Sequence, residues 1–458
     1  MSRNEILGSA VFDRLRAEYE TDWLPRVFVE PPGFHALQGQ RSILVIGDEG
    51  SGRTALCKQL IHLAETGEGG PLIVEWQPSF SPLSGAGLDT YRISMQQIFD
   101  QIARSLVLGI GRQPGAFQKA SAWVQETAIW FAQSYLQGSK RRLLARLEED
   151  AASAESLAAV RRLLTDNVDA VLAPDASERL VIAEVTDIVQ RLGWSGIWLL
   201  VDGLETWLQI EADALTRTLD SLLSTLEFFE IPSFSLKLMA PRLLEPILMQ
   251  SGGVQRNRLA VMHLHWSEAD LRVIVEARLA LASGRDNFSL HELYREDALL
   301  PWLKQYGGDL PRGWLELLRP LADLYFASVE QKPLDQTAWK QVQKRHLPRL
   351  RIDLRLDRVY VGYKEIENIA PIPYQILRYL YEHPARRCSR EEIYYRVYRG
   401  LPSVPQTFQD KNWLHPAEWR SWSATTIARL REAIEPDPGH PVYVVTERGK
   451  EIGLRNAL

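Results

Sequence analysis

One segment of this sequence has the residue types and spacing of a phosphate-binding loop. Residues 47–54, GDEGSGRT, follow an apolar stretch and match the loop pattern, except that arginine stands where the pattern has lysine. Glycines let such a loop point successive backbone N–H groups at a phosphate, and the helix that follows adds partial positive charge. An ordinary glycine-rich turn is the alternative. We expect a nucleotide phosphate to be bound by Gly47, Gly50, Ser51, Gly52, Arg53 and Thr54.

Arginine in place of lysine at position 53 is expected to impair hydrolysis of a nucleotide more than its binding. It keeps a positive charge near the β- and γ-phosphates, but a planar guanidinium does not replace a compact ammonium in a tight loop. Nucleotide binding should therefore survive this exchange better than hydrolysis does. If the protein is an ATPase, we expect it to be a slow one.

A second segment supplies acidic groups for the same site. The apolar run 197–201 ends in Asp202, which is typical of a buried parallel strand whose last residue faces a ligand. We predict that Asp202 and the Thr54 hydroxyl organise Mg²⁺. Glu205 is the candidate to orient an attacking water, although Gly203 stands directly after the aspartate, where glutamate is more usual.

These motifs need a sheet to position them. Apolar runs that alternate with helical patterns are predicted strands, at 43–46, 71–76, 197–201, 234–242 and 259–264. The segment at about 90–190 is a predicted helical insertion, in which the charged stretch 139–165 is expected to be a solvated helix or hairpin. Strands that alternate with helices indicate a parallel α/β sheet whose ligand site lies at the carboxyl ends of the strands.

Length and composition indicate a globular protein of several domains. The chain has 458 residues, of which 45% are hydrophobic and 24% charged, enough for two or three domains. Because a signal peptide and a run of about 18 apolar residues are both lacking, we expect a cytoplasmic protein that does not contact a membrane. Its two cysteines, Cys57 and Cys388, are far apart in the sequence and fit a reducing compartment.

Charge is distributed unevenly along the chain. Residues 351–458 contain 17 lysines and arginines against 14 acidic residues, whereas the other residues contain 36 against 44. The C-terminal segment could therefore contact nucleic acid, and the remainder of the chain is a poor candidate for that role.

The order and spacing of motifs over about residues 25–325 resemble the STAND branch of AAA+-like nucleotide-binding proteins, which are signal-transducing NTPases. This resemblance implies ATP or ADP as the cofactor, together with Mg²⁺. It adds Arg242, in the segment Ala240-Pro241-Arg242, as a sensor of the γ-phosphate, so that the candidate catalytic residues are Asp202, Glu205 and Arg242.

The same resemblance implies a helical lid after the sheet. The segment 308–312, GDLPR, is similar to the lid motif of that family, in which Pro311 would contact the nucleotide and Arg312 would be a second sensor arginine. A simple turn between two helices is the alternative, because glycine commonly ends one helix and proline begins the next.

The C-terminal segment, at about 350–455, is similar to the winged-helix domain of OmpR-type response regulators. Strand-like alternation at 351–361 is followed by helical patterns and by a hairpin pattern. The most specific match lies in 428–431, ARLR, and in 445–449, VTERG.

This second resemblance implies binding to double-stranded DNA. The helix 423–434 would lie in the major groove and the hairpin around 446–453 would be the wing. DNA contacts are expected from the exposed residues Thr425, Thr426 and Arg429, with Arg448 on the backbone phosphates.

Two departures from the winged-helix pattern leave an alternative open. Glu451 and Ile452 stand where that family has glycine and tyrosine, and the loop 400–419 is longer and rich in tryptophan and proline. A winged helix that binds a protein instead of DNA therefore remains the alternative.

The expected fold is a P-loop α/β domain with a helical lid, followed by an α+β winged-helix domain. The expected domains are residues 1–265, 266–347 and 348–458. The expected function is an ATP/ADP switch that controls DNA binding, as a transcriptional or defence-related regulator, with a protein partner or self-association. The alternatives are a DNA-engaging AAA+ ATPase of the loader or mobile-element type, and a nucleotide-free scaffold.

Overall fold

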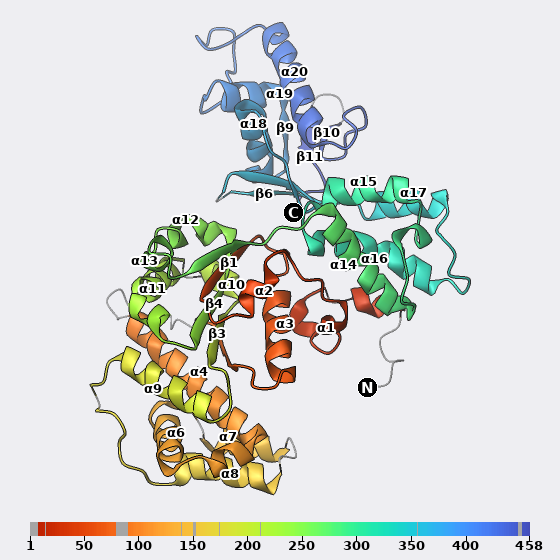
Figure 1. Ribbon diagram of the computed structural model, residues 1–458. Coiled ribbons are helices and arrows are strands. Elements are labelled where there is room, and N and C mark those ends of the chain that lie inside the picture. The colour runs from red at the N-terminus through yellow and green to blue at the C-terminus, as the bar shows by residue number, and fades with distance from the viewer. Residues whose placement is uncertain are drawn as a thin grey trace. The chain divides into compact units, whose positions relative to one another are not determined.

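The chain divides into two compact units, Arg14–Asp270 and Met1–Asp13 with Leu271–Leu458 (Figure 1). This computed structural model describes residues 8–13, 15–78, 90–138, 140–149, 153–173, 175–210, 212–354, 356–447 and 451–458. The division into three domains stays a prediction.

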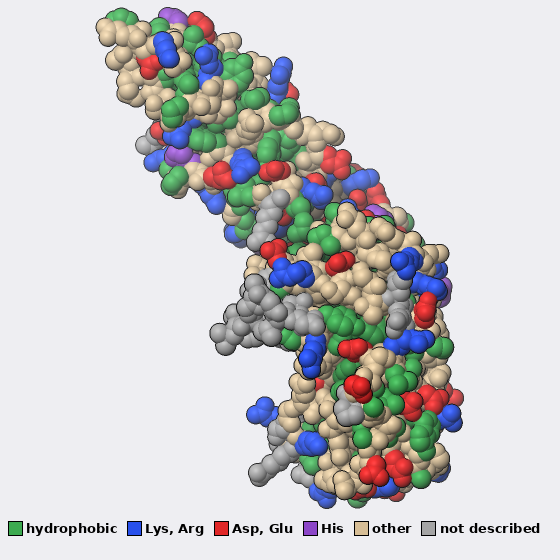
Figure 2. Space-filling model, turned by 90° about the vertical axis from the view of Figure 1, so that its left-hand side faces the viewer, with side chains coloured by type: hydrophobic (Ala, Val, Ile, Leu, Met, Phe, Trp, Pro, Cys, Tyr) green, Lys and Arg blue, Asp and Glu red, His purple; other side chains and the backbone are tan. Residues whose placement is uncertain are grey.

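Charges of both signs are mixed on the face of the protein that Figure 2 shows. On the described residues of the face in Figure 2, lysine and arginine side chains are interspersed with aspartate and glutamate. Within the described part of the chain, no helix is both long and apolar enough to span a membrane.

A parallel sheet of five strands forms the centre of the unit Arg14–Asp270, in the order β2-β3-β4-β1-β5 (Figure 1). The strands are β1 (Ile43–Gly47), β2 (Leu72–Trp76), β3 (Ile197–Val201), β4 (Phe234–Pro241) and β5 (Ala260–His263). Every residue of β1, β3 and β4 is buried, which explains their long apolar runs. The predicted parallel α/β sheet is confirmed.

Helices surround this sheet and extend beyond it. Before and after β1 lie η2 (Ala17–Tyr19), α1 (Leu24–Val27), α2 (Phe34–Leu37) and α3 (Arg53–Thr66). The insertion after β2 contains α4 (Thr90–Arg112), α5 (Pro114–Lys119), α6 (Ala122–Tyr135), α7 (Lys140–Glu149), α8 (Ala154–Thr165) and α9 (Glu178–Arg191). Shorter elements follow β3 and β4, namely α10 (Leu204–Ile210), α11 (Ala212–Ser224), η3 (Leu226–Glu230), η4 (Arg242–Leu244), α12 (Glu245–Leu248) and α13 (Gly252–Gln255).

The insertion is helical as predicted, and one face of its helix α8 is buried. Helix α8 contacts α4 and α6, and it buries Val160 and Leu163 completely. The charged residues Arg161 and Arg162 of α8 are exposed, as expected, whereas the other face of this helix is buried, because its apolar positions recur at helical spacing and pack on its neighbours.

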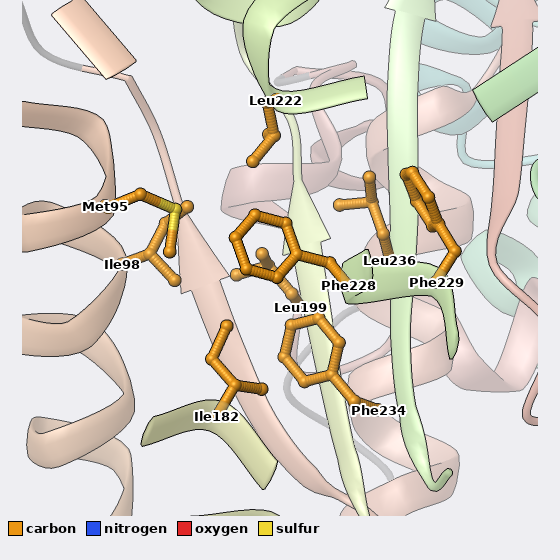
Figure 3. Close-up of a pocket in the computed structure, with 9 residues that line it drawn as sticks. All are labelled: Met95, Ile98, Ile182, Leu199, Leu222, Phe228, Phe229, Phe234 and Leu236. Atoms are coloured by element: carbon orange, nitrogen blue, oxygen red, sulfur yellow. The ribbon is translucent and has the colours of Figure 1, made fainter. Parts of the chain in front are cut away.

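The main hydrophobic core joins the sheet to the helices of the insertion, and it contains a small pocket between β3, β4 and the helices α4, α9 and α11 (Figure 3). Nine hydrophobic side chains line this pocket, namely Met95, Ile98, Ile182, Leu199, Leu222, Phe228, Phe229, Phe234 and Leu236. Because the lining has no polar group that would orient a ligand, we assign the pocket to the core and not to a binding site.

A buried lysine interrupts the apolar strand β4. The Nζ of Lys237 donates hydrogen bonds to the carbonyl oxygens of Gly39 and Arg41, at 2.7 and 2.6 Å, and it lies 5.1 Å from the ring centroid of Trp198. Burial lowers the pKa of this lysine to about 7. Lys237 thus ties the segment before β1 to the middle of the sheet.

Helices and two small sheets make up the other unit. After η1 (Gly8–Phe12), which contacts α16, the helical part contains α14 (Glu268–Ser283), η5 (Leu290–Glu292), α15 (Glu296–Gly307), α16 (Pro311–Ala327) and α17 (Gln336–Arg345). Next comes an antiparallel sheet of β6 (Leu350–Asp353), β7 (Arg358–Val361) and β8 (Lys364–Glu365).

The last part of the chain is α+β, with antiparallel strands as expected. Its helical elements are α18 (Pro371–Glu382), α19 (Arg390–Glu392), η6 (Ile393–Tyr398), which is a π-helical turn, and α20 (Pro416–Ile434). The strands β9 (Arg387–Ser389), β10 (Val444–Glu447) and β11 (Glu451–Leu454) pair in the order β10-β11-β9. Helix α20 begins earlier than predicted, because Pro416 suits a first turn and His415 accepts a hydrogen bond from the Ala417 N–H.

Candidate functional site

The predicted phosphate loop connects β1 to α3. Gly50 and Gly52 have φ values of +84° and +98°, and at Gly52 this left-handed conformation directly precedes the first residue of α3. A side chain would strain the backbone there, so the glycine is needed for the turn into the helix. Ser51 is buried, and its N–H donates to the carbonyl oxygen of Asp48 at 3.1 Å.

Thr54 and Asp202, the predicted pair of magnesium ligands, lie together. The strands β1 and β3 are parallel and separated only by β4, so the segments that follow them meet at the same edge of the sheet. There the Thr54 side chain lies beside the Asp202 carboxylate. Burial raises the pKa of Asp202, while the polar groups of Thr54 and the Gly203 N–H and the charge of Arg53 partly offset this rise.

The oxygen atoms of this pair fit Mg²⁺. This ion is commonly held by one or two protein ligands together with the oxygens of substrate phosphates, and it favours hydroxyl and carboxylate oxygens. Among the described residues there is no group of three or more histidine, cysteine, aspartate and glutamate side chains that could hold a metal alone. A metal at Thr54 and Asp202 would therefore depend on phosphate oxygens.

Arg53 is buried and bound to an acid. Only 6% of its side chain is exposed, and its Nη2 forms an ion pair with the Glu205 carboxylate, which lies at the start of α10. The structure thus places Glu205 beside Arg53. The role of Glu205 in orienting water stays a prediction.

Arg242 lies at the end of β4 and pairs with the phosphate loop itself. Its Nη2 is 3.2 Å from the Oδ2 of Asp48, and both side chains are about one-third exposed, at 35% and 38%. Since β4 is between β1 and β3, Arg242 emerges at the same edge as the loop and Asp202. Contact of Arg242 with a phosphate stays a prediction.

Trp266, which the sequence analysis did not predict, contacts the backbone of the loop. The indole N–H of Trp266 donates to the carbonyl oxygen of Ser51 at 2.7 Å, and the ring is 8% exposed. The sequence contains no local signal for this contact, because the two residues are far apart along the chain.

Pro311 and Arg312 belong to the other unit, at the start of α16. Pro311 is a buried residue of the first turn, which is a favourable position for proline. Just before it, Gly308 has a φ of +58°, and the indole N–H of Trp314 donates to the Gly308 carbonyl oxygen at 2.8 Å. The predicted turn between helices is present. Contact of Pro311 and Arg312 with a nucleotide stays a prediction.

The predicted DNA-contact residues lie on α20, but one of them faces inward. Thr425 and Arg429 are exposed and one helical turn apart. Thr426 is only 8% exposed, and its hydroxyl donates to the Trp422 carbonyl oxygen at 2.9 Å. The expectation that Thr426 is exposed is therefore wrong, because it lies on the face of α20 that packs into the domain. Arg448 lies outside the described residues.

Two side chains at the end of α20 hold the hairpin β10–β11. The buried Glu435 carboxylate accepts hydrogen bonds from the backbone N–H groups of Val442, Tyr443 and Val444 at 2.6–3.1 Å. Arg431 donates to the carbonyl oxygen of Val444 at 2.7 Å. Sequence analysis did not single out either residue, although an acid before proline at a helix end is a usable signal.

The turn between α15 and α16 packs tightly against the hairpin β7–β8 within one unit. The Tyr363 N–H donates to the Tyr306 carbonyl oxygen at 2.8 Å. A Cβ atom on Gly362 would lie 2.5 Å from the same oxygen, and Gly362 has a φ of +65°. The helical part and the α+β part therefore meet through backbone contacts, which we call the lid joint (residues 306–313 and 362–363).

No protein-family model matches the chain. A 75-residue stretch is 39% identical to the transcriptional regulatory protein YvrH of Bacillus subtilis (strain 168). This stretch makes up 16% of this chain and 26% of YvrH. The chain thus spans about a quarter of the length of that relative. The ORC2 protein of Aeropyrum pernix, solved as ADPNP-ADP complexes, matches 91% of this chain and 82% of its own, with 13% identity and a TM-score of 0.34.

Proposed function

We propose that the protein binds ATP or ADP at the phosphate loop and uses the nucleotide to control DNA binding by its α+β part, as a STAND-type switch. One observation carries the proposal: the glycine loop, the neighbouring side chains of Thr54 and Asp202, and Arg242 all lie at the carboxyl edge of one parallel sheet. In such sheets, ligands bind at this edge, and the loop with α3 supplies N–H donors for phosphates.

The DNA-binding part of the proposal rests on α20 and the hairpin. Thr425 and Arg429 present a hydroxyl and a guanidinium from one exposed face of the helix, and both groups can contact bases or phosphates. The similarity of a 75-residue stretch to a transcriptional regulatory protein also supports this role. The partner is double-stranded DNA, and the setting is regulation of transcription or of defence in the cytoplasm.

The lid joint provides a physical route from the nucleotide to DNA. If Pro311 and Arg312 contact the bound nucleotide, a change from ATP to ADP would move α16 and the turn before it. Backbone contacts at Tyr306, Gly362 and Tyr363 would carry the hairpin β7–β8 along, because backbone atoms cannot repack as side chains do. Nucleotide state would in this way bias the position of α20.

The pairing of Arg53 favours a switch over a rapid motor. A motor needs a free cation at the transferring phosphate and a free base for water, whereas here these two candidate groups are bound to each other. A switch can act with slow or absent hydrolysis. We therefore expect nucleotide to be retained more than consumed.

The first experiment asks whether nucleotide is bound and consumed. The full chain is purified and denatured, any released nucleotide is identified by mass analysis, and ATP turnover is measured for the wild type and for Arg53→Lys. Bound ADP or ATP with turnover below about one per minute supports the switch. Rapid wild-type turnover would favour the motor, and lack of binding at millimolar ATP would leave the nucleotide-free scaffold.

A further inference from the structure

Arg53 and Arg242, the two arginines of the candidate site, each form an ion pair with a carboxylate of the same chain. Arg53 is 94% buried, since only 6% of its side chain is exposed, and its Nη2 forms an ion pair with Glu205. Among the described residues, its Nε and Nη1 have no hydrogen-bond partner. A buried guanidinium with unpaired N–H groups is unfavourable, and an additional anion would relieve that cost.

The second pair, Arg242–Asp48, repeats the arrangement near the start of the loop. Asp48 is the second residue of the phosphate loop, and its carboxylate holds Arg242 at 3.2 Å. Within the described part of the chain, the Nε of Arg242 is also buried without a hydrogen-bond partner. Both arginines that would recognise phosphate are therefore held by an acid, and each keeps donors that could serve another anion.

We propose that Glu205 and Asp48 are internal competitors of the nucleotide phosphates for Arg53 and Arg242. A phosphate that reaches Arg53 must take the guanidinium from Glu205 or bind beside that carboxylate, and repulsion between the anions opposes binding in both cases. The same holds for Asp48 at Arg242. This inference rests on the proposed function and assigns Glu205 and Asp48 as positioning residues that set the affinity for phosphate.

Glu205 and Asp48 should differ in how much they weaken phosphate binding. Arg53 is buried, although its partner Glu205 is 34% exposed, whereas Arg242 and Asp48 are both about one-third exposed and screened by water. Removing the charge of Glu205 should therefore raise affinity more than removing the charge of Asp48. A role of Glu205 in orienting water predicts another outcome, namely slower turnover with no gain in affinity.

The test is calorimetric titration of the full chain with ADP, for the wild type and for Glu205→Gln and Asp48→Asn. We expect Glu205→Gln to bind ADP at least about tenfold tighter, and Asp48→Asn about threefold tighter, where tenfold corresponds to about 1.4 kcal/mol. The control is Glu75→Gln, which removes the same charge and an ion pair, that with Lys58 at 2.9 Å. Its ADP affinity should stay within about twofold of the wild type.

Titration with AMP separates competition for phosphate from a general effect of charge. Arg53 stands where the loop residue reaches the β- and γ-phosphates, so the gain in Glu205→Gln should be absent with AMP. If Glu205→Gln shows no unfolding transition, Glu205→Asp is tested in its place. The shorter side chain of aspartate moves the carboxylate away from Arg53, so this variant should show a smaller increase in ADP affinity.

Each outcome decides between the two proposals. Equal or weaker ADP binding by Glu205→Gln, beside clear wild-type binding, overturns the competition and leaves the proposed function intact. The same gain with AMP as with ADP also overturns it. Absence of ADP binding in the wild type and in every variant overturns both.

Discussion

Substitution of Gly362 by alanine tests the lid joint, which links the turn between α15 and α16 to the α+β part. At a φ of +65°, any side chain is strained by about 1 kcal/mol. The added Cβ would also lie 2.5 Å from the Tyr306 carbonyl oxygen, a backbone atom that cannot move away alone. Separating the two backbones weakens the hydrogen bond from Tyr363 to Tyr306 and loosens the packing, at about 2 kcal/mol more.

A matched control isolates this clash from the backbone strain. Gly400 has the same φ of +65°, and nothing lies within 4 Å of the position of its Cβ. In urea unfolding followed by circular dichroism, Gly400→Ala should lower the free energy of unfolding by about 1 kcal/mol and Gly362→Ala by about 3 kcal/mol. Equal losses in the two variants would show that the contact at Tyr306 is not a tight one. Gly362→Ala should also weaken the effect of nucleotide on DNA binding, whereas Gly400→Ala should not.

Three further substitutions test other parts of the account. Lys237 has a pKa of about 7 in the folded protein and about 10.5 in the unfolded chain, so between these pH values the unfolded chain binds more protons than the folded protein. The free energy of unfolding should therefore rise as the pH increases from 7 to 10.5. In urea melts at a series of pH values, Lys237→Met should lack this rise. Arg429→Ala should weaken duplex binding about tenfold in a fluorescence titration and lower its salt dependence by about one ion, and unchanged binding would refute α20 as the DNA-contacting helix. Trp266→Phe removes the 2.7 Å hydrogen bond to Ser51, so it should cost about 1 kcal/mol in unfolding and weaken ADP binding severalfold, and unaltered ADP affinity would contradict its support of the loop.

The sequence predicts the sheet and the loop because their signals are local. Buried parallel strands appear as apolar runs, and the phosphate loop is one continuous segment. The proximity of Thr54 and Asp202 could also be inferred, because the carboxyl ends of parallel strands meet at one edge. These predictions need only the chain order and the direction of the strands.

Contacts between distant side chains could not be predicted. Nothing in the sequence indicates that Arg53 turns toward Glu205, since an arginine in this loop is equally compatible with a solvated side chain. The burial of Thr426 depends on which face of α20 packs into the domain, and a rotation of one residue position reverses the assignment. The lid joint likewise depends on backbone contacts between segments 306–313 and 362–363, which no motif marks.

The central claim is that nucleotide bound at the phosphate loop controls DNA binding. Its most direct test is the duplex affinity of the full chain at a fixed salt concentration, measured by fluorescence anisotropy without nucleotide, with ADP and with ATP and Mg²⁺. We predict at least about a fivefold difference in affinity between two of these conditions, which corresponds to about 1 kcal/mol of coupling, and its loss in Asp202→Asn. Duplex binding that is identical in all three conditions, in a protein shown to bind the nucleotide, would contradict the claim.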